Sequence, residues 1–376
     1  MRSERFDTVV IGGGQAGLAA GYYLARQKRD FVILDAHERV GDSWRKRWDS
    51  LRLFTPASLD QLPGMPFPAS RGHFPTKDEM AEYLEAYAAR FELPVELGMW
   101  VDELIREDDR YRVTAGARRF EANHVVVATG AYPTLRVPKF ASELDPIITQ
   151  IQSVEYRRAS QLRDGLVLVV GAGNSGAEIA RDLSATHPTW LAGPDTGFIP
   201  GTYGSLSYRA GYVIIFTLMK LFTVDTPWGR SVIQKARAFT GGHPLVRVKP
   251  KDLLEAGVQR VPRVAGVRGG QPVLEDGRVL DVVNVVWATG FARDYRWIRL
   301  PIFDAKSDPI HHRGVVLTEP GLYFTGLPLQ SSLLSGHVAA AGDDAKYIVR
   351  QITARATDLA RREKADKLSR RASSTN

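Results

Sequence analysis

The first 35 residues alternate between apolar runs and one glycine-rich turn. Phe6–Ile11 is an apolar, β-branched run typical of a buried parallel strand. It is followed by the turn Gly12–Gly17, by a helical pattern over Leu18–Arg26, and by a second short strand at Phe31–Leu34. This order predicts a strand–turn–helix–strand unit that closes at Asp35, about 20 residues after the glycines.

The residues of this unit suit a nucleotide. Gly12 permits a tight turn, Gly14 lets a pyrophosphate approach the backbone, and Gly17 lets the helix pack close to the strand. The helix N-terminus offers free N–H groups and the positive end of its dipole to the phosphates. Asp35 can accept hydrogen bonds from a ribose. The unit therefore predicts a dinucleotide-binding fold.

The same pattern returns in the middle of the chain. Leu166–Val170 reads as a strand, Gly171–Gly176 as the turn and Ala177–Leu183 as the helix. Two such units in one chain predict two bound nucleotides and electron transfer between them.

Two strand ends resemble each other and mark where the chain changes domain. Val125–Gly130 and Val285–Gly290 each close an apolar run with Ala-Thr-Gly. We therefore predict an α/β protein with two Rossmann-like dinucleotide-binding domains. The first is discontinuous, with residues 1–155 and 286–376, and the second, residues 156–285, is inserted in it.

Four further segments complete the pattern. Thr76 and Glu79 predict a capping box before a helix with apolar residues at helical spacing. A late helix is expected over Gly336–Arg361, followed by a basic tail, Lys364–Asn376, with little apolar surface to bury. The longest apolar run, Tyr212–Phe222, is about half of what a bilayer span needs.

Composition removes several classes of protein. The 50 Lys and Arg outnumber the 42 Asp and Glu, which gives a net charge of +8, but no nucleic-acid reader motif accompanies this charge. The chain has no cysteine, so disulfides, thiolate metal sites and redox-active cysteine pairs are excluded. The histidines are scattered without metal-ligand spacing. We expect a cytoplasmic protein with no metal, no nucleic-acid partner and no membrane span.

At this point the chain resembles the flavin-containing monooxygenase and YUCCA-like family, over nearly its whole length. The resemblance is carried by both glycine turns and both Ala-Thr-Gly ends, and by the segments Trp44-Arg45, Ser50–Pro56 and Leu62–Gly64. It implies FAD at the first glycine turn and NADPH or NADH at the second.

The resemblance also implies roles for individual residues. The FAD pyrophosphate and ribose would contact Gly12, Gly14, Gly17 and Asp35. Trp44 and Arg52 would lie along FAD, and Val101 would face its adenine through the backbone. Four more residues would also bind cofactor: Gln15, Ala16, Thr129 and Gly130. The nicotinamide dinucleotide would lie on Gly171, Gly173, Asn174, Ser175 and Gly176. Phe54 and Asn174 are assigned closest to the chemistry.

Three positions depart from the family pattern. The identifying motif lacks its glycine at Phe140–Ser142 and its histidine in Gln152–Tyr156. Phe54 stands where many members have an asparagine beside the flavin. The segment Leu191–Asp195 offers neither an arginine for a 2′-phosphate nor a strand-tip acid for a ribose. Coenzyme preference therefore stays open.

The resemblance implies an FAD-dependent monooxygenase that uses NAD(P)H. A C4a-peroxyflavin would oxygenate a small substrate at a nitrogen, a sulfur or a carbonyl group, with dioxygen as second substrate. One alternative is a flavin reductase that passes electrons to a quinone or a protein. Another is a redox sensor that binds both nucleotides without turnover. A homodimer is one possible assembly.

Overall fold

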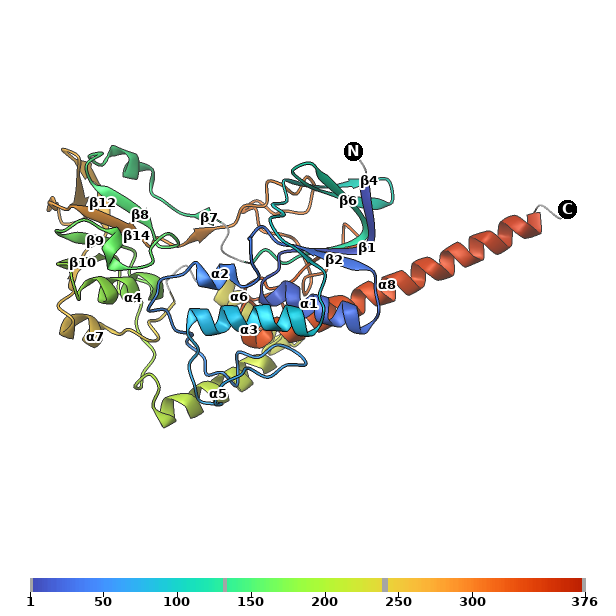
Figure 1. The fold of residues 1–376 in the computed structure, drawn as a ribbon, viewed down its shortest axis with the longest axis horizontal. Coiled ribbons are helices and arrows are strands. Elements are labelled where there is room, and N and C mark those ends of the chain that lie inside the picture. The colour runs from blue at the N-terminus through green and yellow to red at the C-terminus, as the bar shows by residue number, and fades with distance from the viewer. Residues whose placement is uncertain (1–2, 131–133, 239–242, 374–376) are drawn as a thin grey trace.

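The computed structural model describes residues 3–130, 134–238 and 243–373, which form two main sheets with covering helices (Figure 1). The larger sheet has the order β3-β2-β1-β6-β5-β4, and β16 pairs with β6. Its strands are β1 Ser3–Ile11, β2 Phe31–Leu34, β3 Val95–Glu96, β4 Glu103–Glu107, β5 Arg110–Ala115, β6 Arg118–Val127 and β16 Leu322–Phe324. The strands β3, β2, β1, β6 and β16 pair in parallel, whereas β4, β5 and β6 form an antiparallel meander.

The smaller sheet is parallel throughout, in the order β11-β10-β9-β14-β8. Its strands are β8 Thr149–Gln152, β9 Val167–Val170, β10 Thr189–Ala192, β11 Gln259–Val261 and β14 Asn284–Trp287. A mixed sheet with a parallel core and a fully parallel sheet, each with its own glycine turn, agree with the predicted fold class.

The chain crosses between the sheets twice. It leaves the larger sheet after β6 and returns after β14, and the crossing segments pair as β7 Thr134–Leu135 and β15 Phe291–Ala292. Strand β8 precedes the predicted boundary at 155/156, and β14 spans the boundary at 285/286. Both strands lie in the smaller sheet. The domain boundaries themselves stay a prediction.

Helices cover the sheets and extend beyond them. They are α1 Gln15–Arg26, α2 Asp42–Arg45, α3 Lys77–Arg90, α4 Asn174–Leu183, α5 Leu206–Leu221, α6 Pro227–Ala238, α7 Pro250–Glu255 and α8 Val338–Ser373. A hairpin of β12 Val264–Arg268 and β13 Gln271–Leu274 and two 3₁₀ turns, Lys139–Glu143 and Ala159–Gln161, complete the elements. In the described part of the chain, no helix is both long and apolar enough to cross a bilayer.

The largest buried cluster joins α1, α3 and α8 to the sheet, through residues such as Leu18, Tyr83 and Ile348. Helix α3 begins with the predicted capping box, because the Thr76 hydroxyl accepts a hydrogen bond from the Glu79 N–H at 3.2 Å and the Glu79 carboxylate accepts one from the Thr76 N–H at 2.7 Å. These contacts stabilise the N-terminus of α3. Tyr83 of the same helix hydrogen-bonds the loop at Leu62 and Met65.

Helix α8 is longer than the sequence predicts. It continues through Ser373, well past the expected end at Arg361, and its second half projects from the body (Figure 1). Most of the expected tail is therefore helical, and only residues 374–376 of that tail lie outside the described residues.

Candidate functional site

The glycines of the first turn differ in their surroundings: two are closely packed and one faces open space. Gly12 has φ +109°, and a Cβ there would lie 2.5 Å from the Ala128 carbonyl oxygen. A Cβ at Gly17 would lie 1.8 Å from the carbonyl oxygen of Gly12. At Gly14, by contrast, a Cβ would have no described atom within 4 Å. Gly12 and Gly17 therefore close the turn against the sheet, while Gly14 leaves an open space in front of it.

The second glycine turn repeats this geometry. Gly171 has φ +111°, and a Cβ there would lie 2.2 Å from the Ala288 carbonyl oxygen. A Cβ at Gly176 would lie 1.7 Å from the carbonyl oxygen of Gly171, and one at Gly173 would have no described atom within 4 Å. Two turns in different sheets thus leave matching open spaces at corresponding glycines.

Each open glycine is also the N-cap of a helix. Gly14 precedes α1 and Gly173 precedes α4, both with extended backbone angles. Because glycine has no side chain, it offers no acceptor to the N–H groups of the first turn. Those N–H groups and the positive end of the helix dipole form a site suited to an anion such as a phosphate.

Asp35 lies next to the first turn and holds it in shape. Its Oδ2 accepts a hydrogen bond from the Gly13 N–H at 2.5 Å, and its Oδ1 contacts both the backbone N–H and the ring Nδ1 of His37 at 2.8 Å. Burial alone would raise the pKa of Asp35, but hydrogen bonds from His37 and Gly13 outweigh it and lower the pKa. Asp35 is therefore an ionised acceptor at the end of β2.

Several other residues predicted for the first site lie around the same turn. Trp44 in α2 donates a hydrogen bond from Nε1 to Gln15 Oε1 at 3.4 Å. Ala16 is buried in the first turn of α1. Thr129 and Gly130 follow β6, and a Cβ at Gly12 would be 3.1 Å from the Thr129 nitrogen.

Two other residues predicted for the first site have no direct contact with this turn among the described contacts. Arg52 donates a hydrogen bond to the carbonyl oxygen of Phe74 at 3.1 Å. Val101 is half-buried in the core beneath the sheet, and Met99 two residues earlier donates its N–H to the Asp35 carbonyl oxygen at 2.8 Å. The second of these contacts brings the segment before β4 alongside the end of β2.

The two residues assigned closest to the chemistry make structural contacts. Asn174 donates from Nδ2 to the Pro244 carbonyl oxygen at 3.0 Å, and its Oδ1 accepts from the Val246 N–H at 2.9 Å. Phe54 is half-buried against the aromatic cluster of Phe74, Tyr208, Tyr212 and Phe216. Asn174 and its neighbour Ser175 begin α4. The catalytic roles of Phe54 and Asn174 stay predictions.

Thr55, the residue after Phe54, contacts an acid that the sequence did not indicate. Asp60 is 1% exposed, and its Oδ1 accepts a hydrogen bond from the Thr55 hydroxyl at 2.5 Å. Its Oδ2 is buried with no hydrogen-bond partner among the described residues. Burial raises the pKa of Asp60 to about 8, against the effect of Thr55. This carboxyl group therefore carries a proton at neutral pH.

An ion pair that the sequence did not indicate connects helix α4 of the smaller sheet with the loop after α2. Arg247 contacts Glu178 Oε2 at 2.5 Å and donates to the Ser50 carbonyl oxygen at 3.0 Å. Glu178 is 2% exposed, and burial raises its pKa although Arg247 opposes the shift. Trp48 packs into the core of the smaller sheet. The loop after α2 is thus attached to α4.

Another residue that the sequence did not indicate, Arg260, lies beside the carboxyl end of β10. It belongs to β11, and its guanidinium group donates to the carbonyl oxygens of Gly193 and Pro194 at 3.0 and 3.2 Å. The tip of the second strand of a βαβ unit is where the ribose of a dinucleotide lies. Arg260 therefore places a positive charge at the tip of β10, where the segment Leu191–Asp195 itself has no arginine.

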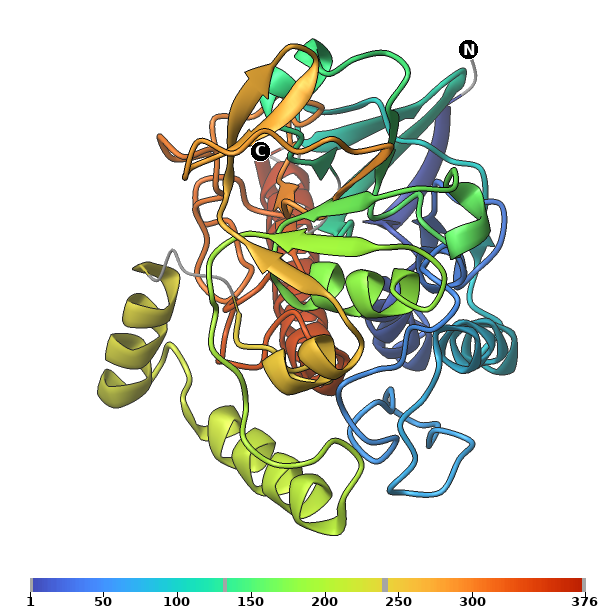
Figure 2. The same ribbon diagram turned by 90° about the vertical axis from the view of Figure 1, so that its left-hand side faces the viewer.

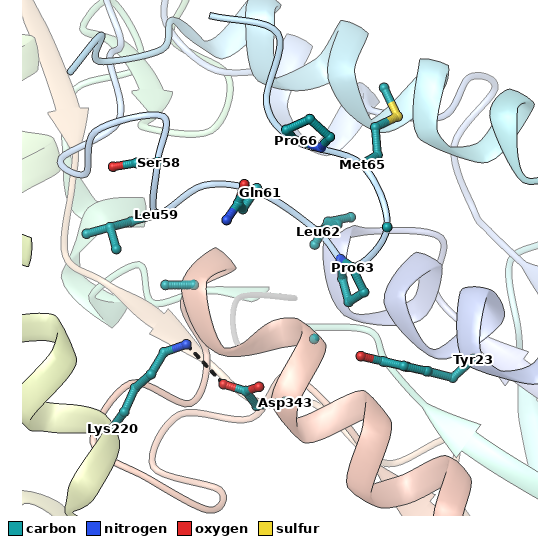
Figure 3. Close-up of a pocket in the computed structure, with 13 residues that line it drawn as sticks. Tyr23, Ser58, Leu59, Gln61, Leu62, Pro63, Met65, Pro66, Lys220 and Asp343 are labelled. Carbon is teal, nitrogen blue, oxygen red and sulfur yellow. Dashed lines mark hydrogen bonds and ion pairs between the residues drawn. The ribbon is translucent and has the colours of Figure 1, made fainter. Parts of the chain in front are cut away.

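A cavity of about 440 Å³ lies apart from both glycine turns (Figure 3). The loop 58–66 forms one side, α1 contributes Tyr23, and α5 and α8 contribute Lys220 and Asp343, whose side chains form an ion pair at 3.1 Å. Tyr23 is nine residues beyond Gly14, or about 13 Å along the helix axis. This cavity is therefore separate from the phosphate-type site at the start of α1.

Comparison with known proteins places this geometry in a family. Residues 9–189 match the pyridine nucleotide-disulphide oxidoreductase model. The chain is 40% identical to an uncharacterized CzcO-like oxidoreductase of Geobacillus kaustophilus, over 92% of this chain and 98% of that one. It is 30% identical to YUCCA9 of Arabidopsis thaliana, a probable indole-3-pyruvate monooxygenase, over 80% and 78% of the two chains.

A solved structure agrees with these relatives. The flavin-containing monooxygenase from Stenotrophomonas maltophilia superposes with a TM-score of 0.74 at 27% identity, covering 94% of this chain and 99% of that one. The predicted family and fold class are thereby confirmed, and so is the prediction of an oxidoreductase. Flavin and nicotinamide cofactors are implied by this kinship. The chain belongs to the flavin-containing monooxygenase and YUCCA-like family of flavoproteins with two dinucleotide-binding domains.

Proposed function

We propose that the protein is an FAD- and NAD(P)H-dependent monooxygenase acting on a small substrate at a nitrogen, a sulfur or a carbonyl group. The observation that carries the proposal is the pair of open glycines, Gly14 and Gly173, each at the N-terminus of a helix that follows a parallel strand. Two equivalent anion sites suit two dinucleotides. The monooxygenase relatives support oxygen transfer as the reaction.

The residues around the first turn fit FAD. The space in front of Gly14 would admit the pyrophosphate, and Asp35 would face the ribose. Gln15, Trp44 and Arg52 would line the same cofactor, with Val101, Thr129 and Gly130 at its edges. When bound, the flavin supplies hydride acceptance and reaction with dioxygen at its C4a carbon.

The second turn fits a nicotinamide dinucleotide for the same reason. The space in front of Gly173 would admit the pyrophosphate, while Gly171 and Gly176 hold the turn against β9 and β14. Asn174 keeps the segment 244–246 beside α4, and so positions the wall of this site.

The surroundings of Phe54 favour exclusion of water. Phe54 packs with Phe74 and the aromatic side chains of α5, and Asp60, which accepts a hydrogen bond from the next residue Thr55, is a protonated, buried acid. A dry site protects reduced flavin from unproductive reactions. Phe54 has no group that donates a hydrogen bond to bound oxygen, and this observation favours the alternative, a reductase that passes electrons to a quinone or a protein.

The decisive experiment measures coenzyme oxidation, oxygen uptake and hydrogen peroxide together, against a panel of thioethers, amines and ketones. We expect at least one compound to stimulate coenzyme oxidation and to appear as its oxygenated product. Fast quinone reduction with no oxygenated product from any compound would assign the protein to the reductases. Binding of both nucleotides with no turnover at all would indicate a sensor.

Arg260 should determine how well NADPH competes with NADH. We expect kcat/KM for the two coenzymes to lie within about a hundredfold, because Arg260 already donates to two carbonyl oxygens and has only its remaining N–H groups for a 2′-phosphate. Arg260→Gln should lower kcat/KM for NADPH by about tenfold and leave that for NADH unchanged. Steady-state kinetics with both coenzymes measure this.

Arg268→Gln is the matched control, because Arg268 is an exposed arginine in β12 of the same region. It should change neither value. Equal losses with NADH and NADPH in Arg260→Gln would show that Arg260 supports the strand tip and has no contact with the 2′-phosphate.

A further inference from the structure

Helix α5 is apolar on two sides, but the described protein covers only one of them. Its inner side carries Tyr208, Tyr212 and Phe216, which pack against Phe74 and Leu334. A helix that is apolar all round is normally buried on all sides. Figure 2 shows α5 and α6 along an outer edge of the molecule, outside the helices that cover the sheets.

The outer side of α5 is a continuous apolar stripe. Its members recur at spacings of three and four residues, so they share one face of the helix. Leu206 is 82% exposed and Leu221 is 68% exposed, at the two ends of the stripe. The full stripe consists of Leu206, Ala210, Val213, Ile214, Thr217, Leu218 and Leu221. The stripe runs along about 24 Å of helix, with Thr217 as its one polar member. The two cations of α5, Arg209 and Lys220, are not part of it, and Lys220 pairs with Asp343.

Helix α6, which follows this stripe in the chain, adds an exposed aromatic ring and cations that have no acidic partner among the described residues. Trp228 is 83% exposed. Arg230 and Lys235 are exposed, and neither forms an ion pair with a described residue. Asp225 is the only acid between residues 205 and 238, and it already pairs with Arg313 and His312. The α5–α6 region therefore has exposed apolar and positive surface with no free negative charge.

The charge distribution decides what covers the stripe. Across the twofold axis of a dimer, this region would face its own copy, with positive charge against positive charge. An anionic phospholipid surface instead offers acyl chains to the stripe and negative headgroups to Arg230 and Lys235. An exposed tryptophan on a helix that also carries cations is typical of the boundary between headgroups and acyl chains. The protein's net charge of +8 favours approach to that surface.

We propose that α5 and α6 bind the surface of an anionic phospholipid membrane. The helices lie along the surface, with the α5 stripe among the outer acyl chains and with Trp228, Arg230 and Lys235 at the headgroups. Membrane contact would place the protein beside lipophilic compounds, a property independent of the reaction proposed above.

The test is flotation of the full-length protein with vesicles of phosphatidylcholine alone and of equal parts phosphatidylcholine and phosphatidylglycerol. We expect binding to the mixed vesicles to exceed binding to the neutral ones by about tenfold and to weaken in high salt. Ile214→Gln/Leu218→Gln should lower binding to the mixed vesicles by about tenfold, because it removes apolar contact from the stripe. Arg230→Gln/Lys235→Gln should lower it by a similar factor.

Leu254→Gln is the control, since Leu254 is an even more exposed leucine on another helix, α7, and it should bind like the wild type. All these side chains are exposed, so the variants should keep the fold, which circular dichroism checks. Absence of vesicle binding by the wild type, or undiminished binding by Ile214→Gln/Leu218→Gln, would overturn the proposal. A dimer that this variant dissociates, without vesicle binding, would assign the stripe to a second copy.

Discussion

Gly14→Val should yield a folded but colourless protein, with a loss of FAD affinity of at least about a hundredfold. The backbone of Gly14 has φ −77° and ψ −173°, which valine adopts readily, and no described atom lies within 4 Å of the added Cβ. The folded chain therefore has room for the side chain. The same side chain would occupy the space in front of the α1 N-terminus, where the proposed pyrophosphate lies.

The measurements are the flavin absorbance of the purified protein, titration with FAD, and far-ultraviolet circular dichroism. Gly266→Val in β12 is the matched control, because Gly266 also has open space and no positive φ. It should retain flavin. Gly17→Val should instead disrupt the fold, since its Cβ would lie 1.8 Å from the Gly12 carbonyl oxygen. A yellow Gly14→Val protein with unchanged FAD affinity would refute the assigned site.

Arg247→Met should lower the free energy of unfolding by about 3 to 5 kcal/mol at pH 8, because it leaves the Glu178 carboxylate buried without its partner. Without Arg247 the pKa of Glu178 should rise further, so the carboxyl group is protonated more readily as the pH falls. The deficit should therefore be larger at pH 8 than at pH 5. Urea unfolding followed by circular dichroism measures it.

The double variant Glu178→Leu/Arg247→Met separates lost charge pairing from lost packing. Replacing a buried ion pair by apolar side chains is often close to neutral, so the double variant should recover most of the lost stability. If Arg247→Met costs less than about 1 kcal/mol at pH 8, the pair does not secure the loop to α4. An equally unstable double variant would attribute the loss to the Ser50 contact of Arg247.

The parts of the protein that the sequence predicted well are local. The strand, turn and helix around Gly12–Gly17 and Gly171–Gly176 follow from neighbouring residues, because positive φ, close packing and N-caps depend on a few consecutive positions. The capping box at Thr76 is equally local. The end of α8 was missed because a basic segment has no apolar periodicity to indicate a helix.

The sequence by itself determined the fold class with two dinucleotide-binding domains, the family and the glycines that form the turns. Only the tertiary structure decided which residues distant in sequence contact each other. Strand pairing of β10 with β11 brings Arg260 to the tip near Gly193, and α4 packing brings Glu178 to Arg247, 69 positions away. The burial that leaves Asp60 protonated and the outer side of α5 uncovered likewise depends on the three-dimensional surroundings of each side chain. Desolvation and long-range contact are properties of the folded chain, which no local pattern encodes.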